Sequence, residues 1–189
     1  MGLYKEMKET FEREYAQRDR LYKDRIIKWN SESPVLRIER PTNIPRAREL
    51  GYKAKEGVVM VRVRIKGGKK KRQPPDGGRK PSKAGRFFSR QKSTQAIAEE
   101  RAATKFTNCE VLNSYFVGSA GSSRFYEVIL LDRSNPSVLA DGNYSRVVSQ
   151  GGRAFRGLTH AGRVHRGVAS KGFGSVRFRP SRRQYMKRS

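Results

Sequence analysis

Basic and aliphatic side chains alternate between residues 57 and 66, in the run GVVMVRVRIK. Successive residues of an extended strand point to opposite faces, so cations on one face recur every ~6.6–6.8 Å. A solvated strand usually mixes polar residues of both signs on its outer face, whereas cations alone favour a surface that binds an anionic ligand. The pattern predicts a half-buried strand, with Val59, Val61, Val63 and Ile65 facing the core and Arg62, Arg64 and Lys66 facing the ligand.

Glycine and basic residues form a second pattern near the C-terminus. Glycine recurs every five residues, at Gly152, Gly157, Gly162, Gly167 and Gly172, with basic residues between. A period of five matches neither a continuous helix nor a strand, so it predicts an irregular, extended segment. Glycine lets the backbone approach a phosphate closely, and interleaved arginines neutralise that phosphate.

The cations of the whole chain are concentrated in two blocks. Residues 33–92 contain 19 Lys/Arg against 4 Asp/Glu, and residues 142–189 contain 12 Lys/Arg and no acid. The remaining residues are close to neutral. A net charge with a magnitude of only ~2–8 suffices to keep a small domain soluble, and this chain carries +26. Such an uneven excess is typical of a protein that binds a polyanion, and it predicts nucleic acid as the partner.

Sequence patterns for catalysis are absent. The chain has no phosphate-binding loop, no dinucleotide fingerprint, no H-E-x-x-H motif and no G-x-S-x-G elbow. Glu99 and Glu100 have the spacing of surface acids on a helix. Cys109, the one cysteine, is interpreted as a small buried hydrophobe, and His160 and His165 have no acid nearby. We predict a protein that is not an enzyme and has no cofactor, no metal site and no small-molecule substrate.

Length and composition favour one domain with appendages. Hydrophobic residues make up 35% of the 189, which indicates that part of the chain cannot fold alone. No apolar run approaches the ~20 residues that cross a bilayer, and the first residues lack the pattern of a secretory signal. A single cysteine suits a reducing compartment. We expect a cytoplasmic protein without a membrane partner.

Large apolar residues recur at helical spacing between residues 3 and 29. They form one stripe, made of Tyr4, Met7, Phe11, Tyr15, Tyr22, Ile26 and Trp29. The stripe predicts a single long helix that ends before Pro34. Packing of the stripe against the domain core is favoured over docking to another protein.

Shorter elements are predicted in the rest of the core. A helix over 93–106 begins with Ser93 or Thr94 as its cap, and a polar linker, 118–123, joins two strands in an antiparallel hairpin. The expected fold class is α+β, with a small mixed sheet packed against helices. The further elements are strands over 35–39, 109–117 and 124–132, one helical turn over 46–50, and a short helix over 136–141.

Two basic appendages complete the expected organisation. A single core spans residues 1–141 and contains an inserted loop at 67–92, whose five Gly and three Pro disfavour regular structure. Residues 142–189 form a basic, irregular C-terminal extension. Phe87 and Phe88 in the loop either stack on bases or pin the loop to the core, and the sequence favours neither.

Several strings, in the same order along the chain, resemble one known family. The most specific is LGYKAK followed by the alternating valine and arginine strand. This order of strings is similar to the fifteen-e protein family of the large ribosomal subunit in archaea and eukaryotes, and the short C-terminal segment is closer to the archaeal type. The strings are RIERPT (37–42), RARELGYKAKEGVVMVRVRIKGGKKKR (46–72), AEERA (98–102), EVLNSYFVG (110–118), FYEVILLD (125–132) and RAFRGLTHAGRVHRG (153–167).

The resemblance implies a structural protein that binds large-subunit ribosomal RNA by charge neutralisation and shape matching. Neighbouring large-subunit ribosomal proteins are its expected further partners. An RNA-modifying enzyme would need a general base or a cofactor loop, and a nucleic-acid compaction protein would have fewer aromatic residues. The predicted RNA-binding residues are Arg37, Arg40, Arg46, Arg48, Lys53, Lys55, Arg62, Arg64, Lys66, Lys69, Lys70, Lys71, Arg72, Arg79, Lys80, Arg86, Arg90, Arg153, Arg156, Arg163 and Arg166.

Overall fold

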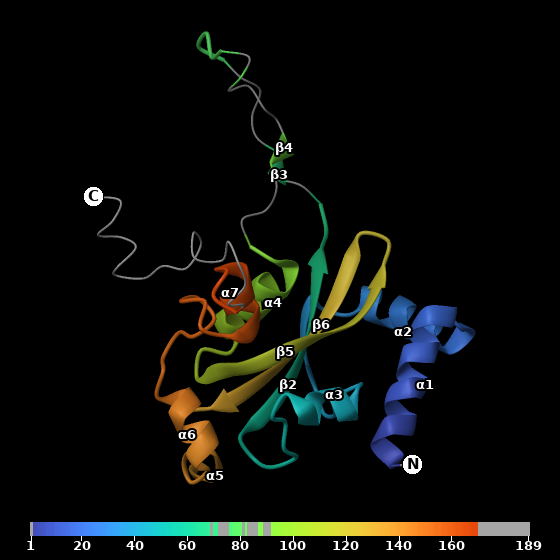
Figure 1. The fold of residues 1–189 in the computed structure, drawn as a ribbon, viewed down its shortest axis with the longest axis vertical. Helices are drawn as coiled ribbons and strands as arrows, with labels where there is room; N and C mark the ends of the chain where they lie inside the picture. The colour runs from blue at the N-terminus through green and yellow to red at the C-terminus, as the bar shows by residue number, and fades with distance from the viewer. Residues whose placement is uncertain are drawn as a thin grey trace.

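A four-stranded sheet forms the centre of the molecule (Figure 1). The computed structural model describes residues 2–68, 70–71, 76–80, 82, 87–88 and 92–169. The strand order is β1-β2-β6-β5. The strands are β1 (Val35–Ile38), β2 (Val58–Lys66), β5 (Cys109–Ala120) and β6 (Ser123–Asp132).

The α+β class predicted from the sequence is confirmed, but every pair in this sheet is antiparallel, so the sheet is not mixed. The chain returns through α4 (Thr94–Lys105), so that β5 runs in the same direction as β2. β6 then lies between these two strands, antiparallel to both.

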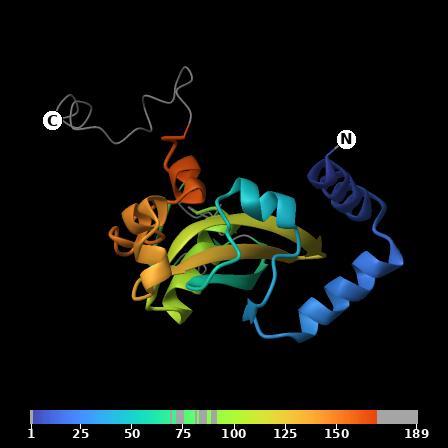
Figure 2. The ribbon, with the colours of Figure 1, turned by 90° about the horizontal axis from the view of Figure 1, so that it is seen from below.

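Apolar clusters cover both faces of the sheet. Val61, Val63 and Ile65 pack with Ala98 and Ala102 of α4 on one face. Met60 and Ile129 pack on the other face, against α2 (Arg20–Ser31) and α3 (Ile44–Glu49). Figure 2 shows α3 and α4 on opposite sides of the sheet. β2 is therefore covered on both faces, although its sequence predicts a half-buried strand.

The N-terminal stripe forms two helices, and the prediction of one long helix is wrong. α1 (Leu3–Gln17) ends at Arg18, which adopts a left-handed conformation with φ of 53°. The break brings the edge of one ring of Tyr15 and Tyr22 against the face of the other, with the ring centres 5.9 Å apart. An ion pair of 3.1 Å between Glu14 and Arg25 also joins the two helices, which meet at an angle (Figure 2).

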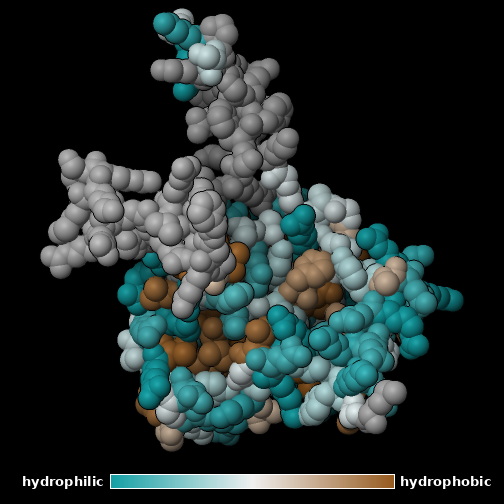
Figure 3. Space-filling model, viewed as in Figure 1, coloured by the Kyte–Doolittle hydropathy of each residue, from teal (hydrophilic) through white to brown (hydrophobic). Residues whose placement is uncertain are grey.

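Only the second helix buries its stripe completely. Tyr22, Ile26 and Trp29 of α2 belong to the core, which confirms the favoured interpretation for this half. α1 has no fully buried residue. The side of the two helices seen in Figure 3 is mostly hydrophilic, although Leu3, Leu21 and Ile27 are exposed. Phe11 and Tyr15 line an open groove of about 390 Å³ beside Phe116, so docking of α1 to another protein stays a prediction.

The hairpin of β5 and β6 extends further than its sequence predicts. Only Gly121 and Ser122 form the turn, and Ala120 pairs with Ser123. The polar linker continues as strand, and α2 packs across it. The hydroxyl of Tyr22 donates a hydrogen bond of 3.1 Å to the carbonyl of Ser119. A Cβ atom at Gly118 would lie 3.0 Å from that same hydroxyl, so a larger residue would require Tyr22 to shift by a few tenths of an ångström.

Two very short strands occur in the basic loop, where the sequence predicts no regular element. β3 (Lys70–Lys71) and β4 (Phe87–Phe88) pair antiparallel and lie beyond the end of the main sheet in Figure 1. Their backbones are described but their side chains are not. Both interpretations of Phe87 and Phe88 therefore stay open.

Residues 142–169 fold onto the core, whereas the sequence predicts an irregular extension from residue 142. The short helices are α5 (Pro136–Leu139), α6 (Gly142–Val148) and α7 (His160–His165). Tyr144 and Val148, one helical turn apart, pack with Leu131 and Val138. Residues 170–189 lie outside the described part of the chain. Among the described residues, no helix has the length and apolar character needed to span a membrane.

Candidate nucleic-acid interface

The cationic face of β2 carries the end of α2. The guanidinium of Arg62 pairs with Glu32 and lies 4.6 Å from the centre of the Trp29 ring. Its side chain is only 12% exposed. Arg64 donates a hydrogen bond to the carbonyl of Asn30. These two arginines hold α2 on the sheet, so the prediction that this cationic face is exposed is wrong for Arg62.

Four predicted RNA-binding cations lie on β1 and α3 and in the turn between these elements. All four are exposed. Arg46 forms an ion pair of 2.6 Å with Glu49 in the same helix. Arg48 donates to the hydroxyl of Tyr4 and lies 5.3 Å from the centre of its ring. The four residues are Arg37, Arg40, Arg46 and Arg48.

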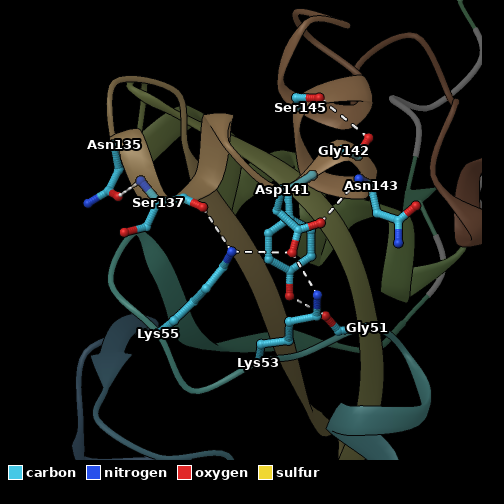
Figure 4. A network of polar contacts seen from close by, with 10 residues as sticks. Gly51, Lys53, Lys55, Asn135, Ser137, Asp141, Gly142, Asn143 and Ser145 are labelled. Atoms are coloured by element: carbon cyan, nitrogen blue, oxygen red, sulfur yellow. Dashed lines mark hydrogen bonds and ion pairs between the residues drawn. The ribbon is translucent and has the colours of Figure 1, made fainter.

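Lys53 and Lys55 converge on one carboxylate (Figure 4). Asp141 accepts hydrogen bonds of 2.6 Å from Lys53 and 3.2 Å from Lys55. The amine of Lys55 also donates to the carbonyl of Ser137 at 2.8 Å. Hydrogen bonding to Lys53 is the main reason that the pKa of Asp141 is well below its usual range. The two lysines thus tie the loop that follows α3 to α5 and α6.

Tyr144 supports the same cluster from beneath. The amines of Lys53 and Lys55 lie 5.2 Å and 4.9 Å from the centre of its ring. Its hydroxyl donates a hydrogen bond of 2.5 Å to the carbonyl of Gly51. Burial, together with the nearby carboxylate of Asp141, raises the pKa of Tyr144 to about 12. No local sequence pattern indicates this arrangement, because Asp141 lies 86 residues from Lys55.

Three buried carboxylates fix segments that are distant in sequence. Glu127 accepts hydrogen bonds from Tyr115 and from both the backbone and the hydroxyl of Thr42. Its amide contact with Thr42 measures 3.0 Å. Burial raises the pKa of Glu127, although these donors oppose the shift. The loop before α3, which precedes Arg46 and Arg48, is thereby held on β6.

Glu99 is the second buried carboxylate, with 1% exposure, and its assignment as a surface acid is wrong. It accepts a hydrogen bond of 2.5 Å from Ser114 and another from Thr159. Thr159 also accepts from the amide of Gly162 at 3.2 Å and so caps α7. Burial raises the pKa of Glu99. Glu100, the next residue, is partly buried and pairs with Lys92 at 2.6 Å.

Glu110 is the third buried carboxylate, and it holds the start of the basic C-terminal segment. Its oxygens accept from the amides of Gly152 at 2.8 Å and Arg153 at 3.2 Å, and it pairs with Arg133. The guanidinium of Arg153 donates to the carbonyl of Val111 at 2.8 Å. Arg153 therefore lies along the core, while the predicted site residues Arg156, Arg163 and Arg166 are exposed.

The five-residue glycine period has a structural cause within the described part of the chain. Gly152, Gly157 and Gly167 have φ values of 68°, 64° and 67°, which side chains rarely adopt. A Cβ atom at Gly162 would lie 2.6 Å from the Cα atom of Gly157. The glycines build turns and a close backbone contact, so they need no phosphate to explain them.

The remaining site residues belong to the basic loop. Arg79 and Lys80 are exposed, as is Lys66 at the end of β2. Only the backbones of Lys70 and Lys71 are described, and four predicted residues lie outside the described ones: Lys69, Arg72, Arg86 and Arg90. RNA contact stays a prediction for the whole set.

The remaining candidate chemistry is structural. Cys109 is partly buried, packs against the cluster that contains Val111, and has a pKa raised by burial. This environment agrees with its interpretation as a small hydrophobe. Within the described residues, no group of three or more His, Cys, Asp or Glu could hold a metal ion.

Comparison with known proteins agrees with the resemblance given above. A relative named large ribosomal subunit protein eL15, from Methanocorpusculum labreanum, is 50% identical over 159 residues, or 84% of this chain and 82% of the relative. A relative of the same name from Picrophilus torridus is 48% identical over 162 residues, or 84% and 83% of the two chains. Both organisms are archaea, and both relatives are named as ribosomal proteins, in agreement with the predicted archaeal type and non-enzymatic character. The family model described as Ribosomal L15 matches residues 2–185. The chain therefore belongs to this ribosomal protein family.

Proposed function

We propose that this protein is a cytoplasmic, structural constituent of the large ribosomal subunit that binds its ribosomal RNA. Exposed cations on a folded scaffold contact phosphates, and the shape of the core determines where they meet the RNA. Neighbouring ribosomal proteins are its further partners. The family membership supports the setting, and the distribution of charge supports the mechanism.

The single observation that carries the proposal is the folded, acid-free segment 142–169. Arg156 and Arg163 are exposed on it, and its sequence contains no Asp or Glu to neutralise them. Glu110 and Glu99 attach the segment to the core from its buried side. The segment therefore presents cations from a fixed backbone, so that no loop has to be ordered when a phosphate is bound.

A salt titration tests the proposal. The full chain is bound to a transcript of large-subunit ribosomal RNA over a range of salt concentrations. Arg156→Gln with Arg163→Gln should weaken binding and reduce the slope of log affinity against log salt by about 1.4–1.8, the value for two phosphate contacts.

The matched control removes the same charge elsewhere. Arg13→Gln with Arg20→Gln changes two exposed cations of the nearly neutral helices α1 and α2. This control should leave most of the affinity and the slope unchanged. Equal effects of the two double variants would show that only net charge matters, and that the C-terminal segment is not the interface.

A further inference from the structure

Phe155 is an exposed aromatic residue on the basic C-terminal segment. Its side chain is 56% exposed, whereas Ala154 beside it is buried at 6%. None of the three apolar clusters among the described residues includes Phe155. Its ring therefore contributes little to the core of this chain.

The backbone that carries the ring is held firmly from below. Amides of Gly152 and Arg153 donate to the buried carboxylate of Glu110. The amides of Arg156 and Leu158 donate to the carbonyls of Gly152 at 3.1 Å and Arg153 at 3.0 Å. A ligand that contacts the ring has to order one side chain and no loop, so little conformational entropy is lost on binding.

Cations lie in this turn and on the helix that meets it, because Gly162 of α7 lies against Gly157. Arg156 follows Phe155 and is exposed, and Arg163 is exposed on α7. The guanidinium of Arg166 lies over the turn, 3.4 Å and 3.3 Å from the carbonyls of Arg156 and Gly157. An apolar protein surface placed here would have to desolvate these guanidinium groups without pairing them. A nucleotide offers both a flat π face for the ring and a phosphate for the cations.

We propose that Phe155 is a stacking platform for an unpaired nucleobase, while Arg156 and Arg163 bind the phosphates beside it. This inference rests on the proposed RNA-binding function, and it adds a base-contacting residue to an interface that otherwise contacts phosphates. Because every nucleobase has a π face, the platform selects single-stranded RNA over duplex but does not select a sequence.

Two probes separate stacking from charge. The full chain is titrated with a twelve-nucleotide oligoadenylate and with an abasic ribose-phosphate oligomer of the same length. Phe155→Leu, which keeps an apolar side chain, should weaken binding to oligoadenylate roughly 5- to 150-fold, the equivalent of one stacked base. It should leave both the salt slope and the affinity for the abasic oligomer unchanged.

Phe155→Trp serves as the conservative variant. It should retain affinity for oligoadenylate, and the added indole fluorescence should be quenched on binding. The thermal midpoint of each variant should match that of the original chain, because the ring is exposed. Equal loss of affinity for both probes would overturn the inference, since it would show a role in the fold or in backbone contact.

Failure of the inference can be distinguished from failure of the proposed function. If Phe155→Leu binds oligoadenylate normally while Arg156→Gln with Arg163→Gln weakens binding, the platform is overturned and the RNA-binding function stands. If neither set has an effect, both the platform and the C-terminal segment as an RNA interface are overturned. If Phe155→Leu spares RNA binding and instead weakens binding to a neighbouring ribosomal protein, the ring belongs to a protein interface and the inference is overturned.

Discussion

The hydroxyl of Thr159 donates a hydrogen bond to the carboxylate of Glu99, and both groups are buried although 60 residues separate them. The same hydroxyl caps α7 by accepting from Gly162. This contact joins the exposed cations of α7 to α4, which packs on the sheet. The position of part of the basic surface therefore depends on one buried acid.

Thr159→Val should detach α7 without unfolding the sheet. The change removes a cap and leaves one oxygen of a buried carboxylate without its partner, which together cost about 2–4 kcal/mol. Hydrogen exchange should show loss of protection in 160–165 and retained protection in β2 and β6. Thr104→Val, at an exposed position of α4, is the control. It should leave the protection of 160–165, and that of β2 and β6, unchanged. Unaltered protection of 160–165 would contradict the anchoring role of Thr159.

Glu99→Gln should change how stability depends on pH. Burial raises the folded-state pKa of Glu99 above its unfolded value of about 4.3. The folded state then binds the proton more tightly, so the original chain loses stability as pH rises from about 4.3 through the raised pKa. Glu99→Gln should therefore lower the free energy of unfolding, relative to the original chain, most in acid and less toward neutral pH. Urea unfolding of both proteins at several pH values measures it.

Asp141→Asn should show the opposite dependence. The folded-state pKa of Asp141 is lowered, chiefly by its hydrogen bond with Lys53. Asp141 contributes its full share of folding stability above its unfolded pKa of about 3.9, and this share is lost as pH falls through the lower folded pKa. The loss in free energy of unfolding caused by Asp141→Asn should therefore be greatest at neutral pH and should vanish in acid. Parallel pH profiles for the two variants would contradict at least one of the two assignments, and the pH at which the loss of stability is largest would show which one.

Gly162→Ala tests whether the glycine period serves the fold. The added Cβ atom would meet the backbone of Gly157 at 2.6 Å, and overpacking of this kind costs about 1–3 kcal/mol. Gly142→Ala is a matched control, because no atom lies within 4 Å of its added Cβ. Thermal unfolding without RNA should show a lower midpoint for the first variant alone. Equal thermal midpoints for the two variants would contradict a role of the glycines in the fold and would favour a role in RNA binding.

Arg62→Glu should destabilise the free protein, because it places two carboxylates together beside Trp29. The pair with Glu32 is largely buried, and its reversal should cost about 1–3 kcal/mol. Exchanging the two residues, as Arg62→Glu with Glu32→Arg, should restore part of the loss. Arg37→Glu, on an exposed position of β1, serves as the charge control. A midpoint unchanged by Arg62→Glu would show that α2 is not held by this pair.

The sequence predicts where the strands and helices form better than it predicts which of their side chains become buried. Alternation in β2 and the helical pattern of α4 are local signals, and each element forms where it is expected. The break at Arg18 has no such signal, because the apolar stripe continues across it. The burial of Arg62 also has no local signal, because its cover, Glu32, follows from where α2 packs and not from any spacing.

The burial of Glu99 and the folded turns of the C-terminal segment cannot be predicted from local sequence patterns. Glu99 and Glu100 are adjacent on one helix, and only the packing of β5 and α7 decides which becomes buried. The glycine period matches no regular element, because left-handed turns alternate with a backbone contact between Gly157 and Gly162. An extended tail and a glycine-built turn have the same composition, so composition alone does not separate them.

The position of β6 in the sheet constrains how this chain can fold as it is synthesised. β6 is the last strand of the main sheet in sequence, yet it lies between β2 and β5. Until Asp132 has emerged, β2 has an open edge of unpaired backbone groups, which other nascent strands could join. Synthesis adds about 5–20 residues per second, so this edge stays open for several seconds after Lys66 is made. The cations of β2 repel other copies of the same strand during that interval, before any RNA is bound.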